Sequence, residues 1–184
     1  MRWWALAIIP CLASMAQATV LMPLDTAALT ARADRVVLGT VETSQAHWSD
    51  DHKSIYTDVT LRVAKVYKGD ASVGGTVTVR REGGSIDGVG MRVFGAASFS
   101  LGEEVVVFME TRGAASYTVG MTQGKLRVVL GADGVKRVAA DLSAVAFVDK
   151  AGAVTHDAAP GVARGPRRLD DFEREIRGYV GTGK

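Results

Sequence analysis

The sequence predicts an all-β fold with a minor α-helical part. Three observations support this prediction. Residues 55–63 alternate between apolar and polar side chains, several further apolar or alternating runs follow between glycine-rich turns, and no strand–helix–strand rhythm is visible. A period of two is typical of a strand with one buried face. Many short strands of this kind indicate a barrel or a sandwich.

A short helix and a strand are the first elements expected after residue 18. Asp25 can cap the start of the helix, which should end near residue 34. Residues 35–43 then predict a strand, in which Gly39 indicates a bulge or a close backbone contact. The polar residues 44–54 predict a loop.

The longest predicted strand covers residues 55–68. Its apolar side chains change parity at Ala64, which predicts a bulge or a sharp bend there, because a shift by one residue turns the buried face over. At the end of the strand we expect Tyr67 to pack at the rim of the sheet. Lys68 should be solvated, and Gly69 should allow the chain to reverse.

The remaining strands are separated by turns, of which one contains Gly124. Two acids, Glu103 and Glu104, precede a continuous apolar run and are expected at its exposed start, whereas the run itself should be buried on both faces. The strands are expected at residues 76–82, 105–109, 116–120, 125–130 and 135–139.

We therefore expect one domain over residues 19–150, folded as an OB-like antiparallel β-barrel that is closed or partly open. The long bent strand and the early helix favour this fold, which is a small five-stranded Greek-key barrel. Residues 151–166 are rich in Ala, Gly and Pro and predict a linker.

The last segment, residues 167–184, predicts an amphipathic helix. Phe172 and Ile176 fall on its apolar side. Glu173 and Arg177 have the spacing of an ion pair and are expected on a solvated outer face. Docking of this helix on its own barrel is favoured over docking on a partner.

The first 18 residues predict a cleaved signal peptide. Arg2 supplies the positive start, an apolar run follows, and Ala16-Gln17-Ala18 matches a cleavage site. The sole cysteine, Cys11, lies in this segment, so the exported chain would carry none. A lipoprotein is the alternative, which Pro10 before the cysteine disfavours. We expect export to a periplasm or to the extracellular space, without stable membrane insertion after cleavage.

The formal net charge is only +2, and the basic residues are dispersed except for a small group near the C-terminus. A nucleic-acid partner would require a basic patch, so none is expected. No cofactor is expected either, and the oligomeric state stays open.

Four segments carry a resemblance to known proteins. They are Ala33–Val41 (ADRVVLGTV), Val63–Asp70 (VAKVYKGD), Gly102–Glu110 (GEEVVVFME) and Gln123–Val128 (QGKLRV). In this order they resemble a group of uncharacterised exported bacterial proteins. More remotely, they are similar to the netrin-like domain of the tissue inhibitors of metalloproteases, which has an OB-like barrel.

The resemblance implies a binding role at the N-terminus of the exported chain. In those inhibitors an N-terminal cysteine binds the zinc of the protease. Here Thr19 takes this place, and only its α-amine could meet a metal. The partner implied is a secreted protein such as a metalloprotease.

The predicted loop 44–54 contains the candidate metal ligands. His47, Asp50 and His52 carry groups that suit zinc or another divalent ion, but a solvated loop explains them with less effort. Trp48, in the same loop, is a candidate partner contact or folds back on the core.

The function expected from the sequence is that of an exported, non-enzymatic binding module. One alternative is a metal-dependent binder or a hydrolase that uses the loop from His47 to His52. The other is a structural protein of the cell envelope.

Overall fold

The computed structural model describes residues 19–143, 145–148, 154–155 and 165–182. The predicted signal peptide and most of the predicted linker lie outside these residues. The described part is mostly β-strand with two α-helices, one of them close to the C-terminus, which confirms the coarse fold class. Within the described residues no helix is both long and apolar enough to cross a membrane.

The elements follow one another with short connections. Those of the first half are β1 (Thr19–Leu21), α1 (Thr26–Arg32), β2 (Arg35–Trp48), β3 (Ile55–Lys68), β4 (Thr76–Glu82), β5 (Gly84–Ile86) and β6 (Val89–Met91). Those of the second half are β7 (Glu104–Arg112), β8 (Ala115–Thr118), the 3-10 helix η1 (Met121–Gly124), β9 (Lys125–Leu130), β10 (Lys136–Ala140), β11 (Val145–Val148), β12 (Val154–Thr155), β13 (Arg167–Arg168) and α2 (Leu169–Thr182).

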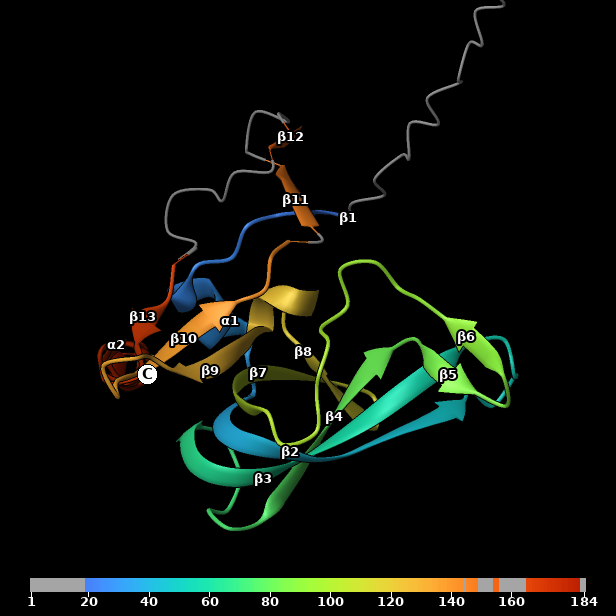
Figure 1. Cartoon of the computed structure of the whole chain (residues 1–184), viewed down its shortest axis with the longest axis horizontal. Helices are drawn as coiled ribbons and strands as arrows, with labels where there is room; N and C mark the ends of the chain where they lie inside the picture. The colour runs from blue at the N-terminus through green and yellow to red at the C-terminus, as the bar shows by residue number, and fades with distance from the viewer. Residues whose placement is uncertain (1–18, 144, 149–153, 156–164, 183–184) are drawn as a thin grey trace, which may run out of the picture.

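The main sheet has the strand order β13-β10-β9-β7-β2-β3-β4-β8 and is partly closed. Strand β8 pairs with β7 in antiparallel fashion and with β4 through one parallel pair, Arg80 with Tyr117. The pairings β2-β3-β4-β8-β7 therefore return to β2. Figure 1 shows the long strands β2 and β3 curving together, with the small β5–β6 hairpin at one end of them.

Strand β3 bends where the change of parity predicts it. Gly39 pairs with Val63 and Leu38 pairs with Lys65, so Ala64 has no partner and forms a bulge. Gly39 itself approaches β3 closely, because a Cβ at this position would lie 2.6 Å from the carbonyl oxygen of Arg62. The bulge lets β3 contribute to two different apolar clusters.

An inner cluster fills the space enclosed by the strands, and an outer cluster lies under the helices. The inner cluster contains Val37, Val41, Val59, Leu61, Val63, Val77, Val79, Val105, Val107 and Met109. The outer cluster includes Leu29, Val36, Leu38, Tyr67, Val106, Phe108, Leu169, Phe172 and Ile176. Strand β7 is buried on both faces, as its continuous apolar run predicts.

Helix α1 begins as expected, because the side chain of Asp25 accepts a hydrogen bond from the amide of Ala28 at 2.7 Å. Its C-terminal end meets Lys68, whose Nζ donates to the carbonyl oxygen of Thr30 at 2.7 Å. The expectation that Lys68 is solvated is therefore wrong. A lysine near the end of a helix satisfies carbonyl groups that have no partner within the helix.

Gly69 and Gly124 lie at close approaches of the backbone. Gly69 has φ +78°, and a Cβ there would lie 2.2 Å from the carbonyl oxygen of Asp34. Gly124 ends η1, and a Cβ there would lie 2.4 Å from the carbonyl oxygen of Val119. Neither position has room for a side chain.

The prediction of a loop over residues 44–54 is wrong for its first part. Strand β2 continues to Trp48 and pairs with β3 up to the pair Trp48–Ile55, so that only residues 49–54 connect the two strands. Ser44 and Gln45 of this extension are exposed, and residues 46–48 are half-buried. Backbone hydrogen bonds to β3 hold this part of β2. They do not depend on the type of side chain, so the sequence shows no apolar alternation here.

Candidate functional site

A cavity of about 530 Å³ opens at the end of the sheet where the β5–β6 hairpin lies. The loop between β6 and β7 arches over this end, as Figure 1 shows. The cavity is lined by Arg81, Gly84, Ser85, Met91, Arg92, Val93, Phe94, Gly95, Ala96, Ser98, Thr122, Asp141 and Ser143. Polar and apolar side chains therefore share its walls.

Arg81 enters the cavity because of its position on β4. Val77 and Val79 belong to the inner cluster, and Arg81 follows them at the same parity of the strand. The residue is half-buried, and it also borders a smaller cavity of about 40 Å³. Burial holds the pKa of Arg81 below its usual value, and no other group contributes to this shift. The guanidinium stays charged, because even a lowered arginine pKa remains far above neutral pH.

Arg81 has no oxygen partner among the residues that the structure describes. Other half-buried arginines do: Arg35 donates to the carbonyl oxygen of Asp70, and Arg80, Arg137 and Arg167 each pair with a carboxylate. Buried or half-buried charges are normally paired, because removing an ion from water is costly. Arg81 is therefore a half-buried cation that lines a cavity and has no oxygen partner among the described residues.

The neighbouring arginine on β4 has the opposite environment. Arg80 points to the other face and donates to both oxygens of Asp58, at 2.7 and 2.8 Å. It also lies over the ring of Tyr56, 5.6 Å from the centroid. This pair holds the pKa of Asp58 below its usual value. Arg80 is thus a structural residue.

Two further charged groups border the cavity. The guanidinium of Arg92 lies over the ring of Phe94, 5.0 Å from the centroid. The carboxylate of Asp141 accepts hydrogen bonds from the hydroxyl and the amide of Ser143, at 2.7 and 3.2 Å. These bonds, aided by the nearby positive charge of Arg127, hold the pKa of Asp141 below its usual value. The cavity therefore carries two positive charges and one negative charge.

The loop over the cavity is fastened at Phe94 and Gly95. The hydroxyl of Thr19 donates to the carbonyl oxygen of Phe94 at 2.7 Å, and the amide of Thr122 donates to that of Gly95 at 3.0 Å. Gly95 has φ +80°, and a Cβ there would lie 3.1 Å from the Cβ of Thr19. Thr19, a binding residue predicted from the sequence, thus lies at the rim of the cavity.

Trp48 lies outside the cavity, at the end of β2. It is half-buried, and its Nε1 is 3.5 Å from Oδ2 of Asp87 in the β5–β6 turn. The ring of His52 lies 6.1 Å from that of Trp48. Trp48 therefore packs between two hairpins.

The predicted metal ligands do not come together. His47 faces back along the sheet, with its Nε2 3.3 Å from Oδ2 of Asp58, whereas Asp50 is exposed in the turn. His52 has φ +54° and packs against Trp48. Within the part of the chain that the structure describes, no three His, Cys, Asp or Glu side chains converge as metal ligands do.

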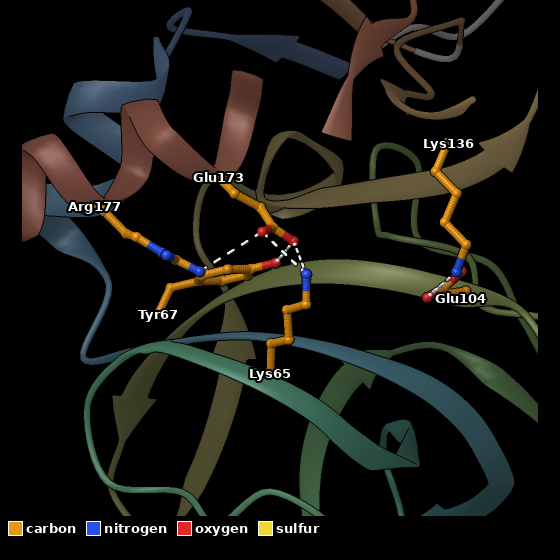
Figure 2. Close-up of polar contacts among 6 residues, drawn as sticks. All are labelled: Lys65, Tyr67, Glu104, Lys136, Glu173 and Arg177. Carbon is orange, nitrogen blue, oxygen red and sulfur yellow. Dashed lines mark hydrogen bonds and ion pairs between the residues drawn. The ribbon is translucent and has the colours of Figure 1, made fainter. Parts of the chain in front are cut away.

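A second polar cluster lies where α2 docks on β3, and it corrects the expectation for Glu173. Figure 2 shows that the carboxylate of Glu173 points toward Lys65 and Tyr67. Its Oε1 accepts hydrogen bonds from Nζ of Lys65 and from the hydroxyl of Tyr67, each at 2.7 Å. The side chain of Glu173 is only 9% exposed, and Arg177 approaches it at 3.7 Å. Glu173 therefore does not lie on a solvated outer face.

This cluster is suited to holding the helix rather than to chemistry. Burial and the adjacent Glu173 raise the pKa of Tyr67, so its hydroxyl stays a proton donor. An adjoining groove of about 430 Å³ is bordered by Lys136, which pairs with Glu104 at 2.6 Å. The acids of the cluster are thus already paired with cations.

Glu103 is another acid whose expected exposure is wrong. Its side chain is 10% exposed, and Oε1 lies 2.5 Å from Nζ of Lys125, whose side chain is only 4% exposed. Arg127 approaches the same oxygen at 3.1 Å, and the ring of Phe99 lies 5.4 Å from the lysine. This buried ion pair ties the end of the loop over the cavity to β9.

The sequence reasoning missed Arg81 and Arg92. A signal for Arg81 was present, because it shares the parity of Val77 and Val79 on a strand with one buried face. A charged residue at an inward position is unusual and indicates a site or a buried ion pair. For Arg92 no comparable pattern exists, since it lies in an irregular segment.

Comparisons with known proteins give no relative for this chain: no family model matches it, and neither do any curated protein sequences or solved structures.

Proposed function

We propose that the protein is an exported, non-enzymatic binding module built on an OB-like barrel, and that it binds its partner at the cavity beside Arg81. The order of pairings β2-β3-β4-β8-β7, with one parallel pair between β4 and β8, supports the OB-like description. The β5–β6 hairpin and the loop after it form the walls of the cavity at one end of this barrel.

The observation that carries the proposal is the half-buried guanidinium of Arg81, which faces the cavity without an oxygen partner among the described residues. An unpaired charge in such a position has an unfavourable desolvation energy. An oxygen of a bound partner would remove this penalty, and the fold would provide the donor in advance. Preorganised donors of this kind are typical of binding sites.

The groups around the cavity favour binding over catalysis. A guanidinium does not act as a base in proteins, and Asp141 is held as a carboxylate by Ser143. A nucleophile or a general base would need an activating partner within hydrogen-bond reach. The cavity offers donors, hydroxyls and apolar surface, which are the components of recognition.

The partner proposed is a protein of the periplasm or of the extracellular space, and a secreted metalloprotease is the class that the sequence resemblance implies. Nucleic acid and a stable membrane anchor have no part in this proposal. Thr19 lies at the rim of the same cavity, which supports a contact from this residue as well.

Affinity capture with a cavity-blocking variant tests the proposal. Ser85 is exposed and lines the cavity, so Ser85→Trp should fill it, whereas Ser72→Trp places the same bulk in the distant β3–β4 turn. The immobilised wild-type protein and the Ser72→Trp variant should retain the same exported protein, and Ser85→Trp should lose it. Equal retention by all three forms, or retention by none, would refute a partner site at the cavity.

A further inference from the structure

We propose that the cavity is a receptor site for a single organic carboxylate, with the guanidinium of Arg81 as its anchor. This inference rests on the proposed binding function and specifies the chemistry of the ligand. It follows from the donor geometry of Arg81, from the charge balance of the cavity and from its apolar walls.

Arg81 suits a carboxylate because a guanidinium presents parallel N–H donors in a fixed plane. Two such donors can bind both oxygens of a carboxylate at once. The same arrangement occurs one residue earlier in this chain, where Arg80 holds both oxygens of Asp58. Arg81 is half-buried, and partial exclusion of water strengthens a charge-assisted hydrogen bond. Arg81 lines the cavity, and no acid among the described residues accepts its donors.

The charge balance favours a ligand with one negative charge. Arg81 and Arg92 contribute two positive charges, and Asp141 contributes one negative charge that Ser143 stabilises. The net charge of the lining is therefore about +1 by this count. A phosphate monoester carries a charge of about −1.5 to −2 at neutral pH, which exceeds the net charge of the lining. A carboxylate matches the cavity.

The size and the apolar walls indicate that the carboxylate is attached to a larger group. A volume of about 530 Å³ lies in the range of sites for organic ligands and exceeds the need of a bare anion. Met91, Val93 and Phe94 line it together with the hydroxyls of Ser85 and Ser98. An apolar side chain next to a carboxylate would contact the three apolar residues, and an amide group would form hydrogen bonds with the two serine hydroxyls. The C-terminal residue of a peptide has this chemistry, and so has a branched organic acid.

A purely structural role for Arg81 predicts a different effect of its replacement on the melting temperature. With no carboxylate partner in the described residues, Arg81 contributes no ion pair to stability. Replacing it by the uncharged Gln should therefore leave the melting temperature unchanged or raise it slightly, while the ligand should no longer bind. A structural residue would show the opposite combination.

Calorimetric titration of the full chain tests the inference with defined probes. The probes are acetyl-Ala-Leu with a free carboxylate, the same dipeptide as its amide, 4-methylpentanoate and inorganic phosphate. The free dipeptide should bind at least about tenfold more tightly than the amide and than phosphate. The amide lacks the charge-assisted pair with Arg81, and the charge of phosphate does not match that of the cavity. Tighter binding of the dipeptide than of 4-methylpentanoate assigns the site to chain ends, and equal binding assigns it to small organic acids.

Three variants complete the experiment. Arg81→Gln should weaken the binding of the free dipeptide at least about tenfold. Arg81→Lys should give an intermediate loss, because lysine keeps the positive charge but lacks the parallel N–H donors of a guanidinium. Arg174→Gln is the matched control, since the side chain of Arg174 is 75% exposed on α2, and it should bind as the wild type does. Equal affinity for dipeptide and amide, or unchanged binding by Arg81→Gln, would overturn the inference.

The outcome is distinguishable from failure of the binding function itself. If Arg81→Gln still captures the exported partner that Ser85→Trp loses, the cavity binds a protein but not through a carboxylate. If neither variant changes capture, the cavity is not the partner site. A melting temperature of Arg81→Gln clearly below that of the wild type would assign Arg81 to the fold and contradict the inference.

Discussion

Replacing Glu173 by alanine tests how α2 is held on the sheet. The carboxylate is 9% exposed and accepts hydrogen bonds from Lys65 and Tyr67 at 2.7 Å, across more than 100 positions of the chain. The apolar anchors Phe172 and Ile176 lie on the same side of the helix and are buried to 1% and 0% exposure. The substitution therefore removes the polar part of the docking surface and leaves the apolar part in place.

The expected loss of unfolding free energy is about 1–4 kcal/mol. Tyr67 is 8% exposed, so its hydroxyl would lose its acceptor inside the protein, which costs about 1–3 kcal/mol. The side chain of Lys65 is 47% exposed and can turn to water, so its lost ion pair contributes only about 0–1 kcal/mol. The larger part of the effect thus belongs to Tyr67.

Urea unfolding of the wild type and four variants measures this. Glu173→Ala and Tyr67→Phe are compared singly and together, with Arg174→Ala as an exposed control on the same helix. In the double variant no unsatisfied hydroxyl remains, so its loss should be smaller than the sum of the single losses by about 1–2 kcal/mol. Additive losses within about 0.5 kcal/mol would show that the Glu173–Tyr67 hydrogen bond does not couple the helix to the sheet.

The pH dependence gives the same experiment a second readout. Burial raises the pKa of Glu173, but hydrogen bonds from Lys65 and Tyr67 and nearby positive charges outweigh it, so the pKa lies below its usual value. A lowered pKa in the folded state contributes stability above the pKa of the unfolded carboxyl, near 4.5, and this stability is lost as the pH falls. The difference in melting temperature between the wild type and Glu173→Gln should therefore shrink from pH 7 to pH 3. A constant difference would contradict this assignment.

Three further substitutions test the fold. Gly69→Val should prevent folding or cost more than about 3 kcal/mol, because its φ is +78° and a Cβ would lie 2.2 Å from the oxygen of Asp34; a native circular dichroism spectrum with an unchanged melting point would disprove this. Phe172→Ala should cost about 3–5 kcal/mol in urea unfolding, and a loss below about 1 kcal/mol would mean that α2 is not part of the core. Lys125→Met should destabilise by about 2–4 kcal/mol because the buried Glu103 keeps only the exposed Arg127 as a partner, and adding Glu103→Gln should restore most of the loss; no restoration would exclude a simple ion pair.

The strands could be predicted from the sequence wherever one face is buried and the other is wet. The alternation from Ile55 to Val63 and the parity change at Ala64 give β3 and its bulge, and the apolar run of β7 gives a strand buried on both faces. The extension of β2 to Trp48 could not be predicted in this way. None of residues 44–48 is fully buried, so this part of the backbone ladder with β3 has no hydrophobic period in the sequence.

The polar contacts of Glu173 and Glu103 could not be predicted, because their partners are distant in the sequence. The spacing of Glu173 and Arg177 describes a local pair, and such a pair is typical of an exposed helix face. In the fold the stronger partners of Glu173 are Lys65 and Tyr67, which a bulge in β3 turns toward the helix. Sequence distance hides such partners, and the same is true of the pairing of Glu103 with Lys125.

The adjacent arginines of β4 bring these arguments together. Arg80 and Arg81 lie on opposite faces of β4, because successive side chains of a strand alternate. In the fold, Arg80 contacts Asp58 and Arg81 lines a cavity. Their local sequence is equivalent, and their desolvation is similar in kind. The difference between them is one carboxylate. The chain supplies that group to Arg80, and no described residue supplies it to Arg81, which is why we propose a carboxylate ligand for the second guanidinium.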